Sequence, residues 1–205
     1  MSVDEILENA NSVREFLRNG GITATGGEPL MQLDFLTELF RKAKTQYDFH
    51  TCLDTSGVCF TNKKEAEYRE LIKYTDLVML DIKHIDPQEH EKLTAQKIDA
   101  VLDFARFLAD NGVSIWIRHV LVPGITQDKD QLYKLGRFIG TLKTLKAVDV
   151  LPYHDMGKAK YETLGIEYPL EGTPIPSKKD VIDAREIIIK GIADTLKEIK
   201  KSDSN

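Results

Sequence analysis

The alternation of short apolar runs with amphipathic helical segments constrains the fold of this chain most strongly. Five runs rich in aliphatic and β-branched residues begin at positions 21, 49, 77, 113 and 147 and cover residues 21–25, 49–53, 77–80, 113–122 and 147–151. This spacing of roughly 30 residues is typical of a strand followed by a crossover helix. Repeated units of this kind align their strands in one direction. The sequence therefore predicts an α/β fold with a parallel sheet of five strands.

Amphipathic helices are expected at both ends of the chain. Ser2 and Glu5 form a capping box that starts a helix expected over residues 2–19, and Ser177 with Asp180 starts the last helix. Since no strand precedes the first helix, the first strand is expected to be an uncovered edge. The side chains expected to face the core are Ile6, Leu7, Ala10, Val13 and Leu17 in the first helix and Val181, Ala184, Ile188, Ile192 and Leu196 in the last.

Length and composition indicate one folded domain over residues 1–199, with a polar tail at 200–205. The 205 residues are 41% hydrophobic and 30% charged, an ordinary globular composition. A net charge of −5 argues against nucleic acid as a partner. The longest apolar runs are far shorter than the roughly 20 residues of a membrane helix, and the first ten residues carry acids where a signal peptide would be basic. The expected location is the cytoplasm, away from any membrane.

Polar residues and glycines follow four of the five runs. In parallel α/β folds, functional side chains gather where strands end, so these segments are expected to share one rim. They are residues 26–29 (GGEP), 54–57 (DTSG), 81–83 (DIK) and 152–154 (PYH).

Each of these residues also has an ordinary structural interpretation. The glycines at 26 and 27 either form a turn or let a ligand approach the backbone. Asp54 and Asp81 either cap nearby amides or, because two carboxylates on adjacent strand ends repel each other, flank a metal ion or an ammonium group. Lys83 either pairs with an aspartate or binds an anionic group. His154 is either a structural histidine or one that stacks on or hydrogen-bonds a ring.

The fourth run carries one further candidate. Alternation places Trp116, Arg118 and Val120 on one face of the strand, opposite His119 and its neighbours. Either face can be the interior, and Arg118 is a site candidate if its own face points inward.

Taken together, six segments resemble the pyruvate formate-lyase activating enzymes, a family of radical S-adenosylmethionine enzymes. The resemblance runs in order along nearly the whole chain. The segments are residues 25–29 (TGGEP), 50–57 (HTCLDTSG), 75–83 (TDLVMLDIK), 113–118 (VSIWIR), 122–124 (VPG) and 151–154 (LPYH).

The resemblance implies a cofactor site and a cation site. The Gly-Gly-Glu turn would receive the methionyl ammonium group of S-adenosylmethionine, Lys83 its carboxylate and His154 its adenosyl part. The implied cofactor-binding residues are Gly26, Gly27, Glu28, Asp81, Ile82, Lys83 and His154. The implied ligands of a monovalent cation are Asp54, Thr55, Asp81 and the carbonyl of Met79.

The resemblance also implies a partial parallel (β/α) barrel of the radical S-adenosylmethionine type, in which this chain has five strands and lacks the first strand and the cluster loop. The family holds a [4Fe-4S] cluster with a Cys-x-x-x-Cys-x-x-Cys loop. Cys52 and Cys59 do not match that spacing and are interpreted as ordinary thiols, so neither iron–sulfur ligands nor catalytic side chains are expected in this chain. We expect the DNA before Met1 to encode roughly 40 to 50 more residues, about one and a half βα units, with the cysteine triad.

The implied activity is reductive cleavage of S-adenosylmethionine followed by hydrogen abstraction from a glycine of pyruvate formate-lyase, with an electron donor such as flavodoxin. Two alternatives stay open. One is a non-catalytic remnant or binding module that holds S-adenosylmethionine weakly or docks on the lyase. The other is a metal-independent βα-barrel lyase that works through Lys83.

Overall fold

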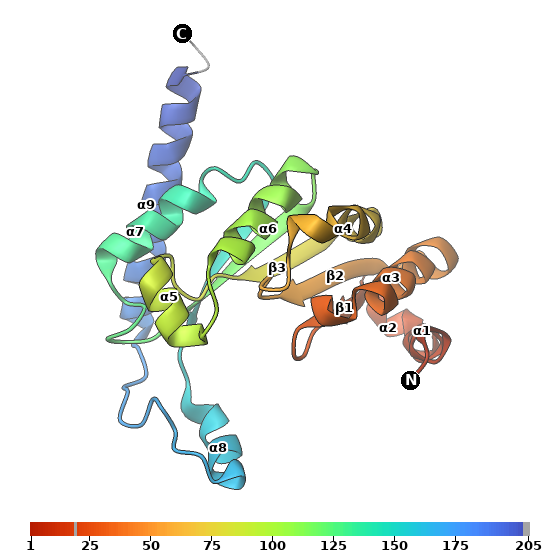
Figure 1. Ribbon diagram of the computed structural model, residues 1–205, viewed down its shortest axis with the longest axis horizontal. Coiled ribbons are helices and arrows are strands. Elements are labelled where there is room, and N and C mark those ends of the chain that lie inside the picture. Colours follow the sequence, from red (N-terminus) through yellow and green to blue (C-terminus); the bar gives the residue numbers. More distant parts are fainter. Residues whose placement is uncertain (19, 203–205) are drawn as a thin grey trace. The chain divides into compact units, whose positions relative to one another are not determined.

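The computed structural model describes residues 1–18 and 20–202, and its five strands form one sheet in the order of the chain. Strand β1 pairs in parallel with β2, and β2 in parallel with β3. The predicted α/β fold with a parallel five-stranded sheet is confirmed (Figure 1). The strands are β1 (Gly21–Ala24), β2 (His50–Thr55), β3 (Leu77–Asp81), β4 (Ser114–Leu121) and β5 (Leu145–Pro152).

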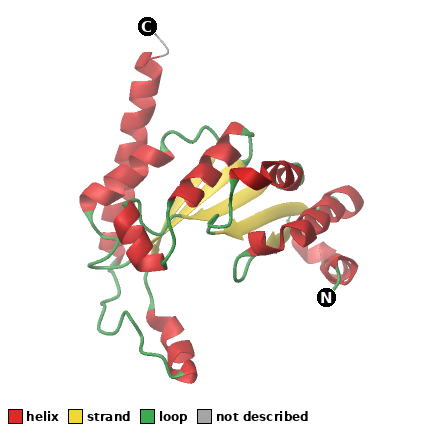
Figure 2. Cartoon of the chain, viewed as in Figure 1, coloured by secondary structure: helices red, strands yellow, loops and turns green. Residues whose placement is uncertain are grey.

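Helices connect the strands, as Figure 2 shows. The α-helices are α1 (Val3–Ser12), α2 (Arg14–Leu17), α3 (Leu33–Tyr47), α4 (Glu65–Ile72), α5 (Pro87–Thr94), α6 (Asp99–Asp110), α7 (Lys129–Ile139), α8 (Lys158–Leu164) and α9 (Lys178–Ser202). Short 3-10 turns are η1 (Pro29–Gln32), η2 (Asn62–Lys64) and η3 (Asp155–Gly157).

The chain forms two compact units, which are described separately. Unit 1 comprises Met1–Ile82, Gln96–Ile117 and Leu142–Ala147, and unit 2 comprises Lys83–Ala95, Arg118–Thr141 and Val148–Asn205. The expectation of a single domain over residues 1–199 stays a prediction.

The core of unit 1 lies between the sheet and its helices. Alternate residues of β3 and β4 are completely buried, among them Val78, Leu80 and Ile117, while their neighbours in sequence are partly exposed. Helices α3, α4 and α6 contribute Phe40, Leu71 and Phe104 to this core (Figure 1). Helices therefore cover one face of β3 and β4, and the other face is more accessible.

The first helix is shorter than predicted. Ser2 and Glu5 form the predicted capping box, with the Ser2 hydroxyl accepting from the Glu5 amide at 3.2 Å. The helix ends at Ser12, and the amide of the next residue, Val13, donates to the carbonyl of Ala10 instead of continuing the α-helical pattern. Val13 is 44% exposed, so its predicted core position is wrong. Residue 19, at the end of the predicted helix, lies outside the described residues.

Unit 2 contains the close packing of α7 on α9. A Cβ atom on Gly136 would lie 2.1 Å from the carbonyl oxygen of Ile188, so this contact requires glycine. The buried positions of α9 are Ala184, Ile188, Gly191 and Thr195, whereas Leu196 is 46% exposed and its predicted core position is wrong. The predicted start at Ser177 and Asp180 is confirmed by hydrogen bonds in both directions between them. Residues 200–202 continue α9, and 203–205 of the expected tail lie outside the described residues.

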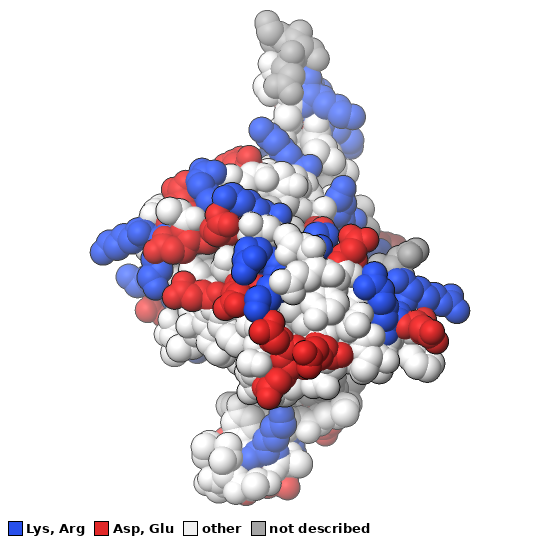
Figure 3. All heavy atoms as spheres, turned by 90° about the vertical axis from the view of Figure 1, so that its right-hand side faces the viewer, with Lys and Arg blue, Asp and Glu red and all other residues white. Residues whose placement is uncertain are grey.

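The described helices include none that is long and apolar enough to cross a membrane. On the face drawn in Figure 3, acidic and basic side chains lie interspersed among neutral ones. Such mixing is typical of an ordinary protein surface.

Candidate functional site

The ends of β1, β2 and β3 bring several predicted site residues of unit 1 together. Asp54 lies directly beside Met79 in the register of β2 and β3, and the Thr25 hydroxyl donates to Asp54 Oδ2 at 3.0 Å. Side chains two residues apart on a strand share a face, so Asp81 lies on the same face of β3 as Met79. Thr25, Asp54, Met79 and Asp81 thus belong to the more accessible face of the sheet at one end of its strands.

The Gly26–Gly27 turn is open. Gly26 has a φ of +119°, which disfavours any residue with a side chain. A Cβ atom built on either glycine would meet nothing within 4 Å, and both residues are exposed. The turn therefore requires glycine at position 26 for its backbone conformation, and a ligand can approach both exposed glycines.

Glu28 holds this turn in place. One carboxylate oxygen accepts from the Leu30 amide at 3.1 Å and from the Thr55 hydroxyl. The other accepts from the Ser56 amide at 3.0 Å and from the Ser56 hydroxyl at 2.6 Å. An ionised carboxylate has about four acceptor positions, so these bonds give Glu28 a positioning role between the loops after β1 and β2. Direct contact of Glu28 with a ligand stays a prediction.

The loop after β2 is also held by a hydrogen bond and by close packing. The Thr55 side-chain oxygen also accepts from the Gly57 amide at 2.9 Å, and Gly57 has a φ of +71°. A Cβ atom on Gly57 would lie 2.9 Å from the ring of Phe104 and 3.0 Å from Leu80. Glycine is therefore required here for both conformation and space, and this loop rests directly on the core of unit 1.

The sequence interpretation did not single out Trp116, which the structure makes a candidate site residue. Because Ile115 and Ile117 are completely buried beneath the helices, Trp116 lies on the more accessible face of β4, and β4 is the neighbour of β3. Its indole Nε1 is buried and finds no hydrogen-bond acceptor within the described part of the chain. A buried N–H without an acceptor is rare in proteins and suits a ligand that supplies one.

The same alternation resolves which face of β4 holds Arg118. Arg118 is half-buried and shares the face of Trp116, whereas His119 is 3% exposed on the covered face. In a βα barrel the face away from the helices is the barrel interior, so Arg118 stays a site candidate. The sequence already indicated this position for Trp116, because residues two apart on a strand share a face and Trp116 lies two residues before Arg118.

Three further predicted site residues differ in their exposure to solvent. Ile82 is completely buried, so none of its atoms is exposed to a ligand. In unit 2, Lys83 is half-buried two residues after the end of β3, and His154 is exposed in extended backbone two residues after the end of β5. Both Lys83 and His154 thus have side chains that are at least partly accessible to solvent.

The two cysteines do not fit a [4Fe-4S] cluster. Cys52 is buried within β2, and burial together with the charge of Glu28 raises the pKa of Cys59, which disfavours the thiolate that iron requires. Among the described residues, there is no group of three or more His, Cys, Asp or Glu side chains arranged to hold a metal ion.

Comparison with known proteins gives a consistent result. Residues 1–136 match the family model of the Radical SAM superfamily. The chain is 44% identical to the pyruvate formate-lyase-activating enzyme of Listeria monocytogenes serovar 1/2a over 191 residues, which cover 91% of this chain and 77% of that protein. It is also 44% identical to the enzyme of the same name from Staphylococcus aureus strain USA300, over 93% of this chain and 78% of the relative.

Solved structures show the same fold. A domain of pyruvate-formate lyase-activating enzyme from Bacteroides vulgatus superposes with a TM-score of 0.68 at 21% identity, covering 84% of this chain and 94% of that chain. A radical SAM methyltransferase from Sphaerobacter thermophilus gives 0.65 at 17% identity, covering 92% of this chain and 54% of that chain. These likenesses confirm the expected partial α/β barrel of the radical SAM type.

Proposed function

Because the chain belongs to the radical SAM superfamily, and within it to the pyruvate formate-lyase-activating enzymes, we propose that it binds S-adenosylmethionine at the ends of β1, β2 and β3 and acts in forming the glycyl radical of pyruvate formate-lyase. Identity of 44% along almost the whole chain favours this enzyme function over a non-catalytic binding module. The lyase acting through Lys83 has no such support.

The open Gly26–Gly27 turn is the observation that supports cofactor binding most directly. Its exposed carbonyls can accept hydrogen bonds from an ammonium group, and Glu28 holds it beside the hydroxyl of Thr55. The buried N–H of Trp116 is a second feature of unit 1 that suits a bound ligand with acceptor atoms. We assign the methionyl ammonium group to the turn and a hydrogen bond from Trp116 to the same cofactor.

A monovalent cation is the second part of this proposal. Its ligands would be Asp54, Thr55, the carbonyl of Met79, and Asp81. The pairing of Asp54 with Met79 supports it, because Asp81 then lies one step further along the same face and two carboxylates at neighbouring strand ends are stabilised by a cation near them. The Thr25 hydroxyl orients Asp54.

Lys83 and His154 complete the proposed cofactor contacts. A lysine ammonium suits the methionyl carboxylate, and an imidazole ring suits the adenosyl part. Their exposure after β3 and β5 is compatible with these roles.

In this family a reduced [4Fe-4S] cluster supplies the electron that cleaves the cofactor. Neither Cys52 nor Cys59 is suited to hold it, so no residue of this chain is assigned to the cluster. The proposal also includes an electron donor such as flavodoxin and a cytoplasmic location.

Calorimetric titration with S-adenosylmethionine tests the binding site. We expect Asp81→Ala and His154→Ala each to weaken binding about tenfold, which corresponds to losing roughly 1.4 kcal/mol of contacts. Asp110→Ala, at an exposed position of α6, is the matched control and should bind like the unmodified chain. Binding that is the same in all three variants would place the cofactor elsewhere.

A further inference from the structure

Unit 2 contains a pocket that none of the proposed cofactor contacts uses. It has a volume of about 410 Å³ and is lined mainly by apolar groups. The segments that follow β3, β4 and β5 all contribute to its wall. The lining residues are Glu89, Lys92 and Leu93 of α5, Gly124 and Ile125 after β4, Tyr161 of α8, and Pro169 and Leu170 of the next loop.

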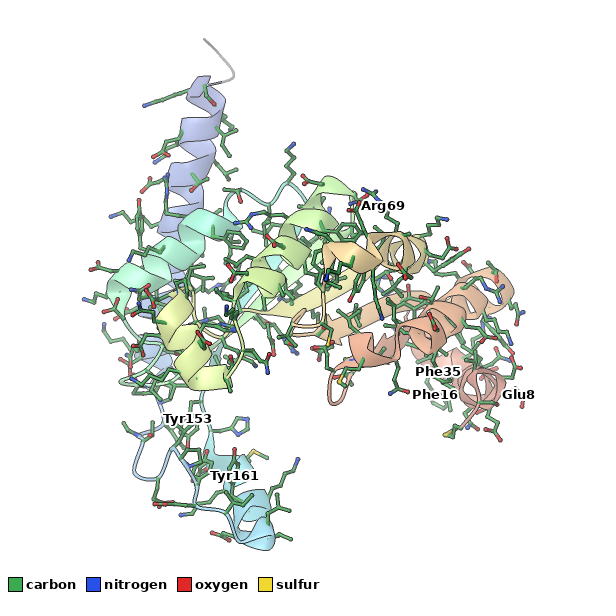
Figure 4. All side chains as sticks on the ribbon, in the orientation of Figure 1. Glu8, Phe16, Phe35, Arg69, Tyr153 and Tyr161 are labelled. Carbon is green, nitrogen blue, oxygen red and sulfur yellow. The ribbon has the colours of Figure 1, made fainter. Side chains whose placement is uncertain are left out.

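Tyr161, which lines the pocket, is held by contacts with two further tyrosines. The ring of Tyr161 packs edge-on against Tyr168 with centroids 5.1 Å apart, and the Tyr168 hydroxyl lies 2.8 Å from that of Tyr153. Figure 4 shows Tyr153 and Tyr161 in this part of the molecule. Tyr153 directly follows β5, so these contacts connect α8 to the end of that strand. An ion pair of Lys158 with Glu171 at 2.8 Å also ties α8 to its following loop.

The same segment carries an unusual number of exposed apolar side chains. Met156, Leu164, Ile166 and Ile175 are between 56% and 79% exposed. Scattered apolar residues are normal on a surface, but several within about 20 residues beside an apolar pocket indicate an interaction site. We name residues 155–176 the α8 segment. In Figure 3, this segment lies at the bottom of the view, where most of the visible side chains are neutral.

The charge of the α8 segment is acidic. It carries Asp155, Glu162, Glu167 and Glu171 against Lys158 and Lys160, a formal charge of −2. Since Lys158 pairs with Glu171, the exposed carboxylates of Asp155, Glu162 and Glu167 face solvent with one exposed lysine, Lys160, among them. A partner with basic groups next to an apolar group would complement this surface.

We propose that the pocket binds an apolar side chain of an extended polypeptide, and that the acidic α8 segment holds a basic residue next to it. Resting on the proposed function, this assigns the pocket to a stretch of the protein substrate, the lyase. A small molecule would leave the exposed apolar side chains uncovered, whereas a polypeptide covers both pocket and segment. A symmetric second copy is disfavoured because it would bring two acidic segments together.

Fluorescence anisotropy tests the proposal with a labelled peptide of about 15 residues spanning the radical-bearing glycine of the lyase from the same organism. Leu93 is 38% exposed, so Leu93→Asp can place a charge in the pocket without removing core packing. We expect this variant to bind the peptide at least tenfold more weakly. Ile189→Asp is the matched control, since Ile189 is 47% exposed on α9 and lies outside the pocket lining; it should bind like the unmodified chain.

The charge of the rim is tested separately. We expect the double variant Glu162→Lys, Glu167→Lys to bind the same peptide several-fold more weakly at low salt. The double variant should bind a peptide whose lysines and arginines are replaced by glutamine about as well as the unmodified chain does. Equal binding of the native peptide to all variants would overturn the proposal. So would sedimentation showing that the chain forms a dimer that Leu93→Asp dissociates.

A failure of this proposal is distinguishable from a failure of the proposed function. Leu93→Asp should bind S-adenosylmethionine like the unmodified chain. Cofactor binding that depends on Asp81, together with peptide binding indifferent to Leu93, would overturn the pocket assignment alone. Peptide binding that depends on Leu93, without any cofactor binding, would support the pocket and contradict the proposed cofactor site.

Discussion

Single side chains decide how the turn after β1 is held. Glu28 accepts hydrogen bonds from Thr55 and Ser56, which lie 27 and 28 residues further along the chain. These bonds hold the turn that contains Gly26 and Gly27. This arrangement separates two tasks that the motif alone does not distinguish. The glycines present the backbone to a ligand, and the carboxylate keeps that backbone in position.

Glu28→Gln should lower both stability and cofactor affinity. An amide offers one acceptor oxygen where the carboxylate offers two, so at least one of the bonds from Thr55 and Ser56 is lost. Hydrogen bonds to a charged group contribute about 1.5–3 kcal/mol, and we expect a loss of that size in the free energy of unfolding, measured with urea. Glu8→Gln, at an exposed position of α1 labelled in Figure 4, should leave stability unchanged. Equal stability of both variants would contradict the positioning role.

Trp116→Phe should affect binding and stability differently. The substitution removes the indole N–H that lacks an acceptor within the described residues. An unsatisfied buried donor costs about 1–3 kcal/mol, and its removal offsets the packing lost with the smaller ring. We therefore expect the free energy of unfolding to change by less than about 1 kcal/mol, while calorimetry shows several-fold weaker binding of S-adenosylmethionine. Unchanged cofactor affinity would remove Trp116 from the site.

Between elements, Asp76 joins the start of β2 to α3 in unit 1. Its carboxylate accepts from the Thr51 amide at 2.8 Å and from Lys44 of α3 at 2.9 Å. Burial opposes ionisation of Asp76, but the bonds from Lys44 and Thr51 outweigh it and lower the pKa of the carboxyl group. The register of β2 beside β3 thus depends partly on this charge.

The Asp76 network predicts a loss of stability in acid. Because the pKa is lower in the folded than in the unfolded chain, the contribution of Asp76 is present above a pH of about 4 and is lost as the pH falls through the folded-state value. We expect Asp76→Asn to be less stable at pH 7 and to lose less stability than the unmodified chain between pH 5 and 3. Asp103→Asn, in an exposed pair with Arg106, should follow the unmodified chain in a urea titration at each pH. Parallel curves for all three would contradict the role of Asp76.

For the molecule as a whole, the family holds a [4Fe-4S] cluster, but neither Cys52 nor Cys59 is suited to bind one. We expect anaerobic reconstitution of the 205-residue chain to yield well under one iron per chain after desalting, because one cysteine is buried in a strand and the other has a raised pKa. Iron and sulfide analysis with a visible absorption spectrum measures this. Four irons per chain, retained after desalting as in a complete cluster, would contradict it.

Much of the fold follows from patterns that span only a few residues. The spacing of apolar runs predicted the parallel sheet, and the pairs Ser2 with Glu5 and Ser177 with Asp180 predicted where two helices begin. These features depend on local hydrogen bonds and on which side of a strand or helix is apolar. Both properties are the same in a short segment as in the folded chain, so they can be read without knowing the tertiary structure.

The remaining features depended on which elements pack together. Leu196 fits an apolar stripe, yet Gly191 and Thr195 occupy the contact because α7 approaches too closely for large side chains. The hydrogen bonds of Glu28, the burial of the Trp116 N–H and the pocket beside the α8 segment likewise depend on residues far apart in sequence. Such contacts form only when packing brings distant segments within a few ångströms, because hydrogen bonds and close packing are lost beyond that range.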